Sequence, residues 1–191
     1  MDLLARLALA RKHIRELSRL RRNPTFVESL SEKRIAEFGA RVAVLDHDGV
    51  LGPNRSLGPD EAGQDLISHA VAVFGSGMVF ILSNTKAMRK ERRMAYGQQY
   101  TDVVYIVAKP KPDPDGVMQA SWASGAPMDK IVVLDDGLLT GILMALECGA
   151  MAVYAQRRYM EESWMAWVIR LATTWPQIAI VRAMELLFLF K

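Results

Sequence analysis

Short apolar runs alternate with helical patterns along most of the chain. Five runs are typical of buried strands, because they are short and rich in β-branched residues; they cover residues 42–45, 78–82, 103–108, 131–134 and 151–154. Patterns with helical spacing lie between them, at roughly residues 60–73, 86–96, 115–123 and 138–147. Strands that alternate with helices predict a Rossmann-like α/β fold of three layers, α/β/α, around a mainly parallel five-stranded sheet.

Both ends of the chain differ from this central pattern. Apolar residues from Leu3 to Leu17 recur at helical spacing, and Asn23-Pro24 follows. We therefore expect extra amphipathic helices at both termini and three parts: a basic helix over 1–23, an α/β core over 24–158, and apolar, Trp-rich helices over 159–191. Pro176 predicts a break between two C-terminal helices.

The C-terminal segment is apolar but interrupted. Its longest uncharged run, Leu171 to Val181, has 11 residues, whereas a membrane-spanning helix needs about 20. We therefore expect no transmembrane segment. Trp164, Trp167 and Trp175 form a helical stripe that suits a membrane interface, the core of the fold or an oligomer interface equally well.

Charge is concentrated at the N-terminus. Residues 1–22 contain seven Arg/Lys and two acidic residues, a net charge of +5, whereas the whole chain of 191 residues has +3. The basic surface is therefore a terminal feature, and we expect no nucleic-acid partner. The single cysteine, Cys148, excludes a disulfide within the chain.

The candidate chemistry begins at the end of the first strand. Asp46 and Asp48 follow the run at 42–45, and alternation along an extended chain can place both on one side. Two adjacent buried acids are unfavourable without a cation or a shared proton. This pair therefore predicts a divalent metal, while His47 between them is expected to pack in the fold.

The later strands also end in polar residues. Ser83-Asn84-Thr85 follows the second run, Lys109 and Lys111 follow the third, and Asp135-Asp136 follows the fourth. Because ligands of parallel sheets bind beyond the carboxyl ends of the strands, we expect these groups to meet at one edge.

This ordered set resembles the haloacid dehalogenase (HAD) superfamily of phosphatases, subfamily IIIA. The stretch Pro24 to Leu30, the Gly39-Ala40-Arg41 entry to the first strand, and Asp136-Gly137-Leu138-Leu139-Thr140-Gly141 are similar to the phosphatidylglycerophosphate phosphatase family within it. Three positions depart from the family pattern. Asp135 replaces a glycine, Gly141 replaces a second aspartate, and Val50 replaces a threonine. Asp135 could compensate for Gly141, and metal affinity is the property in question.

The resemblance implies roles for the acidic residues. Asp46 would be the nucleophile that forms an aspartyl-phosphate, and Asp48 the general acid and base. Mg²⁺ would be held by Asp46, the backbone carbonyl of Asp48 and Asp136, with Asp135 binding through water.

The resemblance also implies a phosphate-binding set. Ser83 with Asn84, and Lys111, would bind the phosphoryl oxygens. Lys109 competes with Lys111 for this role, and the 25-residue step from Lys111 to Asp136 favours Lys111.

Spacing bears on the substrate. Only 34 residues separate Asp48 from Ser83, and 27 separate Ser83 from Lys111, so we expect no cap domain and a site suited to a bulky phosphate. The basic and Trp-rich ends favour a phosphate at a membrane surface. The resemblance then implies dephosphorylation of phosphatidylglycerophosphate, an anionic phospholipid, through peripheral contact with the membrane. The expected location is the cytoplasm, on the inner face of a membrane, or the mitochondrial matrix in a eukaryote.

Other interpretations stay open. The enzyme could act on a soluble or macromolecular phosphomonoester, or the chain could be a catalytically weak lipid-binding or scaffold protein. A DxD glycosyltransferase leaves Ser83, Lys111 and Asp135-Asp136 unexplained. The terminal helices could instead pack on each other or form a homo-oligomer.

Overall fold

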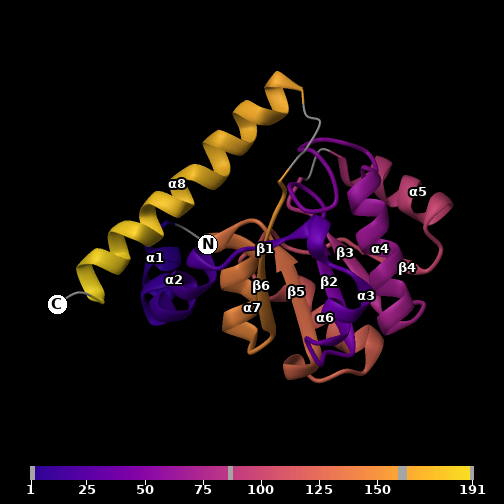
Figure 1. Cartoon of the computed structure of the whole chain (residues 1–191), viewed down its shortest axis with the longest axis horizontal. Helices are drawn as coiled ribbons and strands as arrows, with labels where there is room; N and C mark the ends of the chain where they lie inside the picture. Colours follow the sequence, from indigo (N-terminus) through magenta and orange to yellow (C-terminus); the bar gives the residue numbers. More distant parts are fainter. Residues whose placement is uncertain (1–2, 86–87, 159–162, 190–191) are drawn as a thin grey trace.

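The computed structural model describes residues 3–85, 88–158 and 163–189. Lys86, the first residue of the helix predicted over 86–96, and the ends of the two terminal segments lie outside the described residues. The described chain has an α/β architecture, in which a parallel sheet lies between helices (Figure 1).

The sheet has six strands in the order β1-β6-β5-β2-β3-β4, and every neighbouring pair is parallel. Their bounds are β1 Thr25–Phe26, β2 Val42–Asp46, β3 Val79–Leu82, β4 Val103–Ile106, β5 Ile131–Asp135 and β6 Met151–Gln156. The predicted count of five was wrong. The extra strand, β1, has two residues and pairs Thr25 with Ala155 of β6, and so short a strand leaves no apolar run in the sequence.

Alternate residues of the strands face two apolar layers, as the pleat requires. On one face, Leu45 and Ile81 pack with Leu66 and Tyr96. The helices of this layer are α3 Glu32–Ala36, α4 Glu61–Phe74 and α5 Arg89–Gln99. On the other face, Val44 packs with residues of α6 Asp115–Ser124 and α7 Leu143–Cys148.

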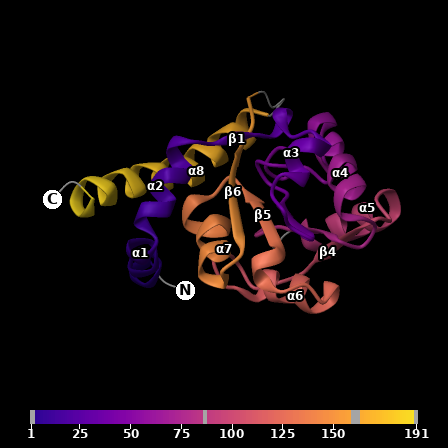
Figure 2. The ribbon, with the colours of Figure 1, turned by 60° about the horizontal axis from the view of Figure 1, so that its bottom comes forward.

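The terminal helices form a third apolar cluster beside the sheet (Figure 2). It joins α1 Leu3–Lys12, α2 Ile14–Arg22 and α8 Trp164–Phe188 to β6 and to the π-helical turn η4 Leu138–Ile142. The two ends therefore pack on each other, which was one of the open alternatives. Buried Glu185 of α8 reinforces the contact through ion pairs with Arg21 and Arg22 of α2.

Two helix predictions differ from the structure. The single N-terminal helix is divided at His13 into α1 and α2. The predicted break at Pro176 is absent, because α8 continues through it. Residues beyond the proline, Val181 and Met184, are buried against the third cluster, and this packing outweighs the lost hydrogen bond. None of the described helices is long and apolar enough to span a bilayer.

Candidate functional site

The carboxyl ends of four neighbouring strands bring the predicted residues to one edge of the sheet. Asp46 ends β2, Ser83 follows β3, Lys111 follows β4, and Asp135 ends β5. These strands are neighbours in the order β5-β2-β3-β4. The expected convergence at one edge is therefore observed, although the chain positions span ninety residues.

Lys111 lies at the centre of the edge. Its Nζ is 2.6 Å from Asp46 Oδ1 and 2.6 Å from Asp135 Oδ2. All three side chains are buried. Burial alone would disfavour the ammonium, but the charges of Asp135 and Asp46 outweigh it and raise the pKa of Lys111. Lys109, the competing lysine, is exposed, so the residue placed between the carboxylates is Lys111.

Asp46 and Asp135 form a cluster of three carboxylates with Asp136 beside this lysine. Oxygens of Asp46, Asp135 and Asp136 lie within 4.8 Å of one another. Burial raises the pKa of Asp46 well above its usual range, and burial followed by the charge of Asp135 raises the pKa of Asp136 to about 7. The cluster therefore carries more negative charge than Lys111 neutralises, and it favours bound protons or a cation.

Glycines make the room for these carboxylates. A Cβ on Gly141 would lie 1.8 Å from Asp135 Oδ2, and a Cβ on Gly49 would lie 2.3 Å from Asp136 Oδ2. Gly49 also has φ +87°, which L side chains rarely adopt. The Asp135 carboxylate thus lies against a position where any side chain would displace it, so Asp135 and Gly141 are structurally coupled.

The oxygens differ in what they already bind. Asp135 accepts from the Gly137 N–H through Oδ1 and from Lys111 through Oδ2. Asp46 uses Oδ1 for both the His47 N–H and Lys111. Among the described residues, Asp136 receives only a long contact of 3.5 Å from Thr174 Oγ1. Asp46 and Asp136 therefore have oxygens available for a hard divalent cation, whereas Asp135 mainly balances Lys111.

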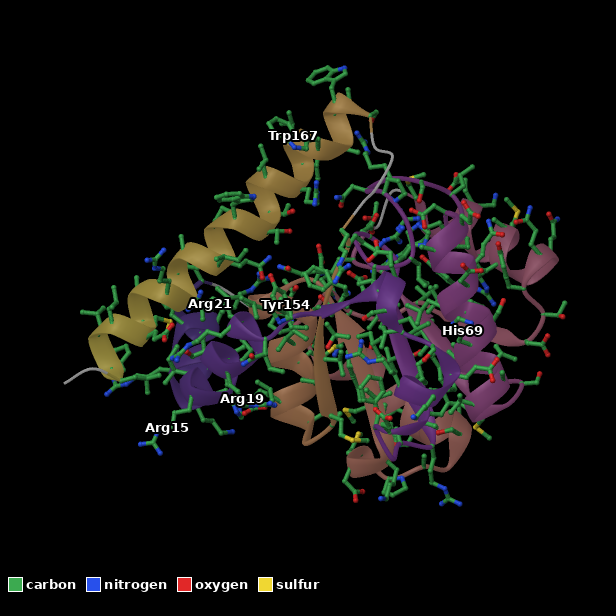
Figure 3. The ribbon with its side chains drawn as sticks, viewed as in Figure 1. Arg15, Arg19, Arg21, His69, Tyr154 and Trp167 are labelled. Carbon is green, nitrogen blue, oxygen red and sulfur yellow. The ribbon has the colours of Figure 1, made fainter. Side chains whose placement is uncertain are left out.

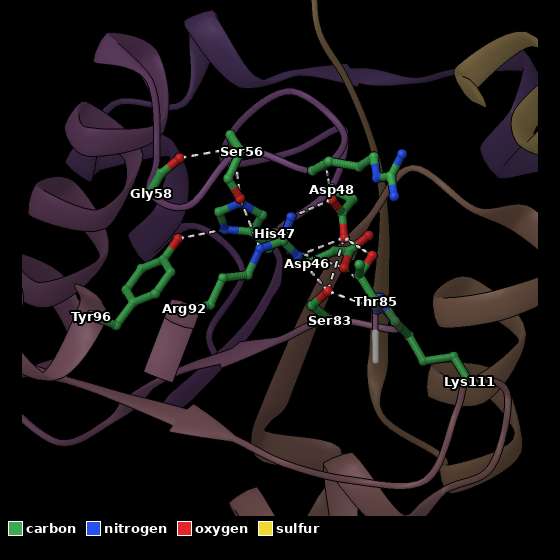
Figure 4. A network of polar contacts seen from close by, with 11 residues as sticks. Asp46, His47, Asp48, Ser56, Gly58, Ser83, Thr85, Arg92, Tyr96 and Lys111 are labelled. Carbon is green, nitrogen blue, oxygen red and sulfur yellow. Dashed lines mark hydrogen bonds and ion pairs between the residues drawn. The ribbon is translucent and has the colours of Figure 1, made fainter. Parts of the chain in front are cut away.

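Asp48 is bound differently from the prediction, because its carboxylate is paired with an arginine (Figure 4). Arg92 of α5 is fully buried, and its NH1 and NH2 donate to Asp48 Oδ2 and Oδ1 at 2.8 and 2.7 Å. Burial would raise the pKa of Asp48, but the hydrogen bonds and charge of Arg92 outweigh it and hold the pKa well below the usual range. Asp48 is therefore ionised and outside the carboxylate cluster.

The hydroxyl groups that follow β3 also donate hydrogen bonds to Asp48. Ser83 Oγ and Thr85 Oγ1 donate to Asp48 Oδ2 at 2.8 and 2.9 Å. Arg92 NH1 also donates to Ser83 Oγ at 2.7 Å, so the serine hydroxyl is enclosed. Asn84 accepts from the Lys111 backbone N–H at 2.7 Å and thereby positions the lysine loop. In this arrangement Ser83 and Asn84 hold other site residues rather than an open phosphate position.

The sequence interpretation missed Arg92. Arg92 lies among other basic residues, a pattern that is typical of a solvated helix face. It is also four residues before Tyr96, and both side chains are buried. Positions four apart share a helix face, and this spacing was the available signal. Tyr96 OH lies 2.7 Å from His47 Nδ1. Burial, followed by the charge of Arg92, lowers the pKa of His47 to about 4, so His47 is a neutral packed residue as predicted.

A cavity of about 410 Å³ opens at this edge. Asp46, Asp48, Asn84, Lys111 and Asp136 line it from the sheet, and α8 lines it from the other side. The Leu139 N–H donates to Gln177 Oε1 at 2.7 Å, which fastens α8 to the turn after β5. The site is therefore bordered by the C-terminal helix, a feature that its position late in the chain does not indicate.

Comparisons with known proteins add little. No protein-family model matches the chain, and no curated protein matches it. Among solved structures, an uncharacterized protein from Corynebacterium glutamicum is similar, with 24% identity, a TM-score of 0.43, and coverage of 70% of this chain and 94% of that one.

Proposed function

We propose that this protein is a Mg²⁺-dependent phosphatase that hydrolyses a phosphomonoester through an aspartyl-phosphate on Asp46. The observation that carries the proposal is the buried Asp46–Lys111–Asp135 arrangement, with both lysine contacts at 2.6 Å and Asp136 alongside. A cationic group beside a carboxylate nucleophile suits the transfer of an anionic phosphoryl group.

Asp46 is the nucleophile in this proposal. The His47 N–H and Lys111 both hold Oδ1, so Oδ2 is the attacking oxygen. Attack forms the bond from Asp46 to phosphorus and breaks the bond from phosphorus to the ester oxygen, which takes a proton from water. A second water then attacks the phosphorus and loses a proton, and the Asp46–phosphorus bond breaks, which releases phosphate and restores the carboxylate.

Lys111 keeps its proton throughout. Its two carboxylate contacts raise its pKa, so it is a fixed positive charge beside the phosphorus and not a proton donor. Asp135 also contacts the ammonium, at 2.6 Å, and keeps it in place when phosphorylation removes the charge of Asp46.

The donor set at this edge fits Mg²⁺. Asp46 and Asp136 would hold it, with Asp135 nearby through water, and Gly49 and Gly141 leave the space for these carboxylates. When bound, the ion would offset the negative charge of the phosphoryl oxygens as they approach the carboxylates.

The ionised state of Asp48 suits a general base better than a general acid. As an ionised carboxylate it can accept a proton from the attacking water, but it can protonate the leaving oxygen only after it gains a proton itself. The pairing with Arg92 opposes that step. This observation favours the second candidate, a lipid-binding or scaffold protein with weak catalysis.

The proposed substrate is phosphatidylglycerophosphate, at a membrane that the protein contacts peripherally. The motif resemblance supports it, and so do the exposed tryptophans of α8, of which Trp164 and Trp175 are 74% and 65% exposed. The basic N-terminal segment would favour an anionic surface. The corresponding location is the cytoplasmic face of a membrane, or the matrix face in mitochondria.

Phosphate release from p-nitrophenyl phosphate with Mg²⁺ tests whether the chain is an enzyme. We expect Asp46→Asn to lower kcat by about a thousandfold or more. Asp129→Asn, an exposed aspartate in the turn before β5, is the matched control and should retain activity. Equal rates for wild type and Asp46→Asn would contradict the proposal.

A substrate panel then separates the enzymatic alternatives. We expect hydrolysis of phosphatidylglycerophosphate in vesicles to exceed that of nucleotides and sugar phosphates in kcat/KM. A preference for a soluble phosphate would favour the soluble-substrate alternative, and specific lipid binding without turnover would favour the scaffold.

A further inference from the structure

The cavity at the carboxyl edge has one basic residue that does not come from the strands. Arg6 of α1 lines it, together with residues of α8 and the carboxylates of the sheet edge. The first turns of the chain and its last helix thus complete a cavity whose other wall holds Asp46, Lys111 and Asp136. A side chain from the N-terminal helix is therefore available to whatever molecule enters.

Arg6 has an unsatisfied donor. Its Nε is buried and has no hydrogen-bond partner among the described residues. A buried donor without a partner destabilises the folded protein, more so when the group is charged, and such atoms are uncommon in folded proteins. Asp46 and Asp135 are instead paired with Lys111. An anionic ligand atom would satisfy Arg6.

The chemistry of the cavity restricts that ligand. The guanidinium is a planar fork that binds two oxygens of a phosphate or carboxylate side by side, and it stays charged at any accessible pH. Apolar side chains of Leu3, Ile169 and Ile180 line the same cavity. A volume of about 410 Å³ lies within the range of small-ligand sites. The cavity thus suits a phosphomonoester that has a second anionic group and an apolar extension.

We infer that Arg6 binds a second anionic group of the substrate, a phosphodiester, while the phosphomonoester occupies the Asp46–Lys111 edge. The inference rests on the proposed function and makes Arg6 a specificity-determining residue. Simple monoesters engage only the sheet edge. Substrates with a phosphodiester engage both walls, and the entropy of placing the second group is reduced once the first is bound.

Calorimetric titration tests the inference without turnover. The Asp46→Asn protein with Mg²⁺ would be titrated with the deacylated substrate, glycerophosphoglycerol phosphate, and with glycerol 3-phosphate. We expect the diester-containing probe to bind more tightly. Adding Arg6→Gln should lower its affinity about tenfold, and should lower the ratio of the two affinities by a similar factor.

Arg15→Gln is the matched control. It removes the same charge from the same basic segment, and Figure 3 shows Arg15 on the side of the N-terminal helices that faces away from α8. Arg15 is also exposed. An equal loss of affinity with Arg15→Gln would mean that only net charge matters. An equal loss of affinity for both ligands with Arg6→Gln would mean that Arg6 does not bind the second anionic group. Either result overturns the inference.

A second variant at position 6 distinguishes loss of binding from loss of folding. Arg6→Lys keeps the charge but removes Nε and the fork, so with an unchanged Tm we expect about a threefold or larger loss for the diester-containing probe. Unchanged affinity in this variant would also overturn the inference. Absence of turnover in the wild-type protein would refute the proposed phosphatase function, whereas the binding ratio would still report on Arg6.

Discussion

At the scale of single residues, the position of the Asp135 carboxylate depends on the glycine at position 141. The Asp135 carboxylate lies against Gly141, where a Cβ would be 1.8 Å from Oδ2. The motif pattern proposed from the sequence has glycine and aspartate at the opposite positions. The structure thus supplies a physical reason why Asp135 and Gly141 occur together. Asp135 with a larger residue at position 141 would crowd the carboxylate, and Gly141 without Asp135 would leave no carboxylate there.

Exchange of these two residues tests the coupling. Gly141→Ala should destabilise the protein by about 1–3 kcal/mol, because a methyl group overlaps the carboxylate that neutralises Lys111. The double variant Asp135→Gly/Gly141→Asp should recover at least half of that loss in chemical denaturation. A double variant that is less stable than Gly141→Ala would contradict the coupling.

The acidity of Asp136 predicts a pH dependence. Its pKa is raised from 3.8 to about 7, so the folded state holds this proton more tightly than the unfolded chain. Its contribution to stability is present below pH 3.8 and is lost as pH rises toward about 7. Mg²⁺ binds the ionised carboxylate, so the stabilisation of the fold by Mg²⁺ should increase as the pH rises toward about 7.

Thermal unfolding with and without Mg²⁺ measures this effect. We expect the increase in Tm caused by Mg²⁺ to be larger at pH 8 than at pH 5.5, and Asp136→Asn to remove most of the difference. A Mg²⁺ effect of the same size at both pH values in the wild-type protein would show that Asp136 is not involved.

Among the elements, α5 has the role that was least expected. Arg92 connects it to the end of β2 through Asp48, and to the loop after β2 through the Ser56 carbonyl at 2.8 Å. His47 contacts the same loop and Tyr96 of α5 (Figure 4). The helix therefore sets the position and the charge state of Asp48 without reaching the cavity itself.

A double-mutant cycle measures this connection. Arg92→Gln should cost about 3 kcal/mol, because it leaves the partly buried Asp48 carboxylate without its cationic partner. Asp48→Asn combined with Arg92→Gln should cost less than the sum of the single changes, by about 1 kcal/mol or more. Additive losses in urea denaturation would indicate that the pair has no net coupling.

At the scale of the whole molecule, the two ends of the chain are part of the fold. Leu17 of α2 and Val181 of α8 are buried in one cluster with Leu139 of the turn after β5. Deleting the terminal segments would therefore expose core. In contrast, the tryptophans of α8 are not core of this chain, since Trp167 is 49% exposed and lies toward the end of α8 that extends past the α1–α2 layer (Figure 3).

Flotation with vesicles containing anionic lipid tests the proposed membrane contact. Replacement of Trp164, Trp167 and Trp175 by serine should reduce the recovery of vesicle-bound protein about tenfold or more, because each ring buries apolar area. Trp122→Ser is the control, since Trp122 is 70% exposed on α6. Equal recovery of the triple variant and wild type would exclude this face as the contact.

The sequence by itself determined the fold class and the residues of the edge. Buried strands leave apolar runs, and parallel strands deliver the residues that follow them to one edge, so local pattern could place Asp46 and Asp136 together with Lys109 or Lys111. The family spacing favoured Lys111, and the structure places Lys111 between Asp46 and Asp135. Contacts between distant segments leave no such pattern. Only the tertiary structure revealed the two-residue strand β1, the continuity of α8 through Pro176, the Arg92–Asp48 pair and the approach of Arg6 to the cavity. Each depends on packing between residues far apart in the chain, which local hydrophobic spacing does not encode.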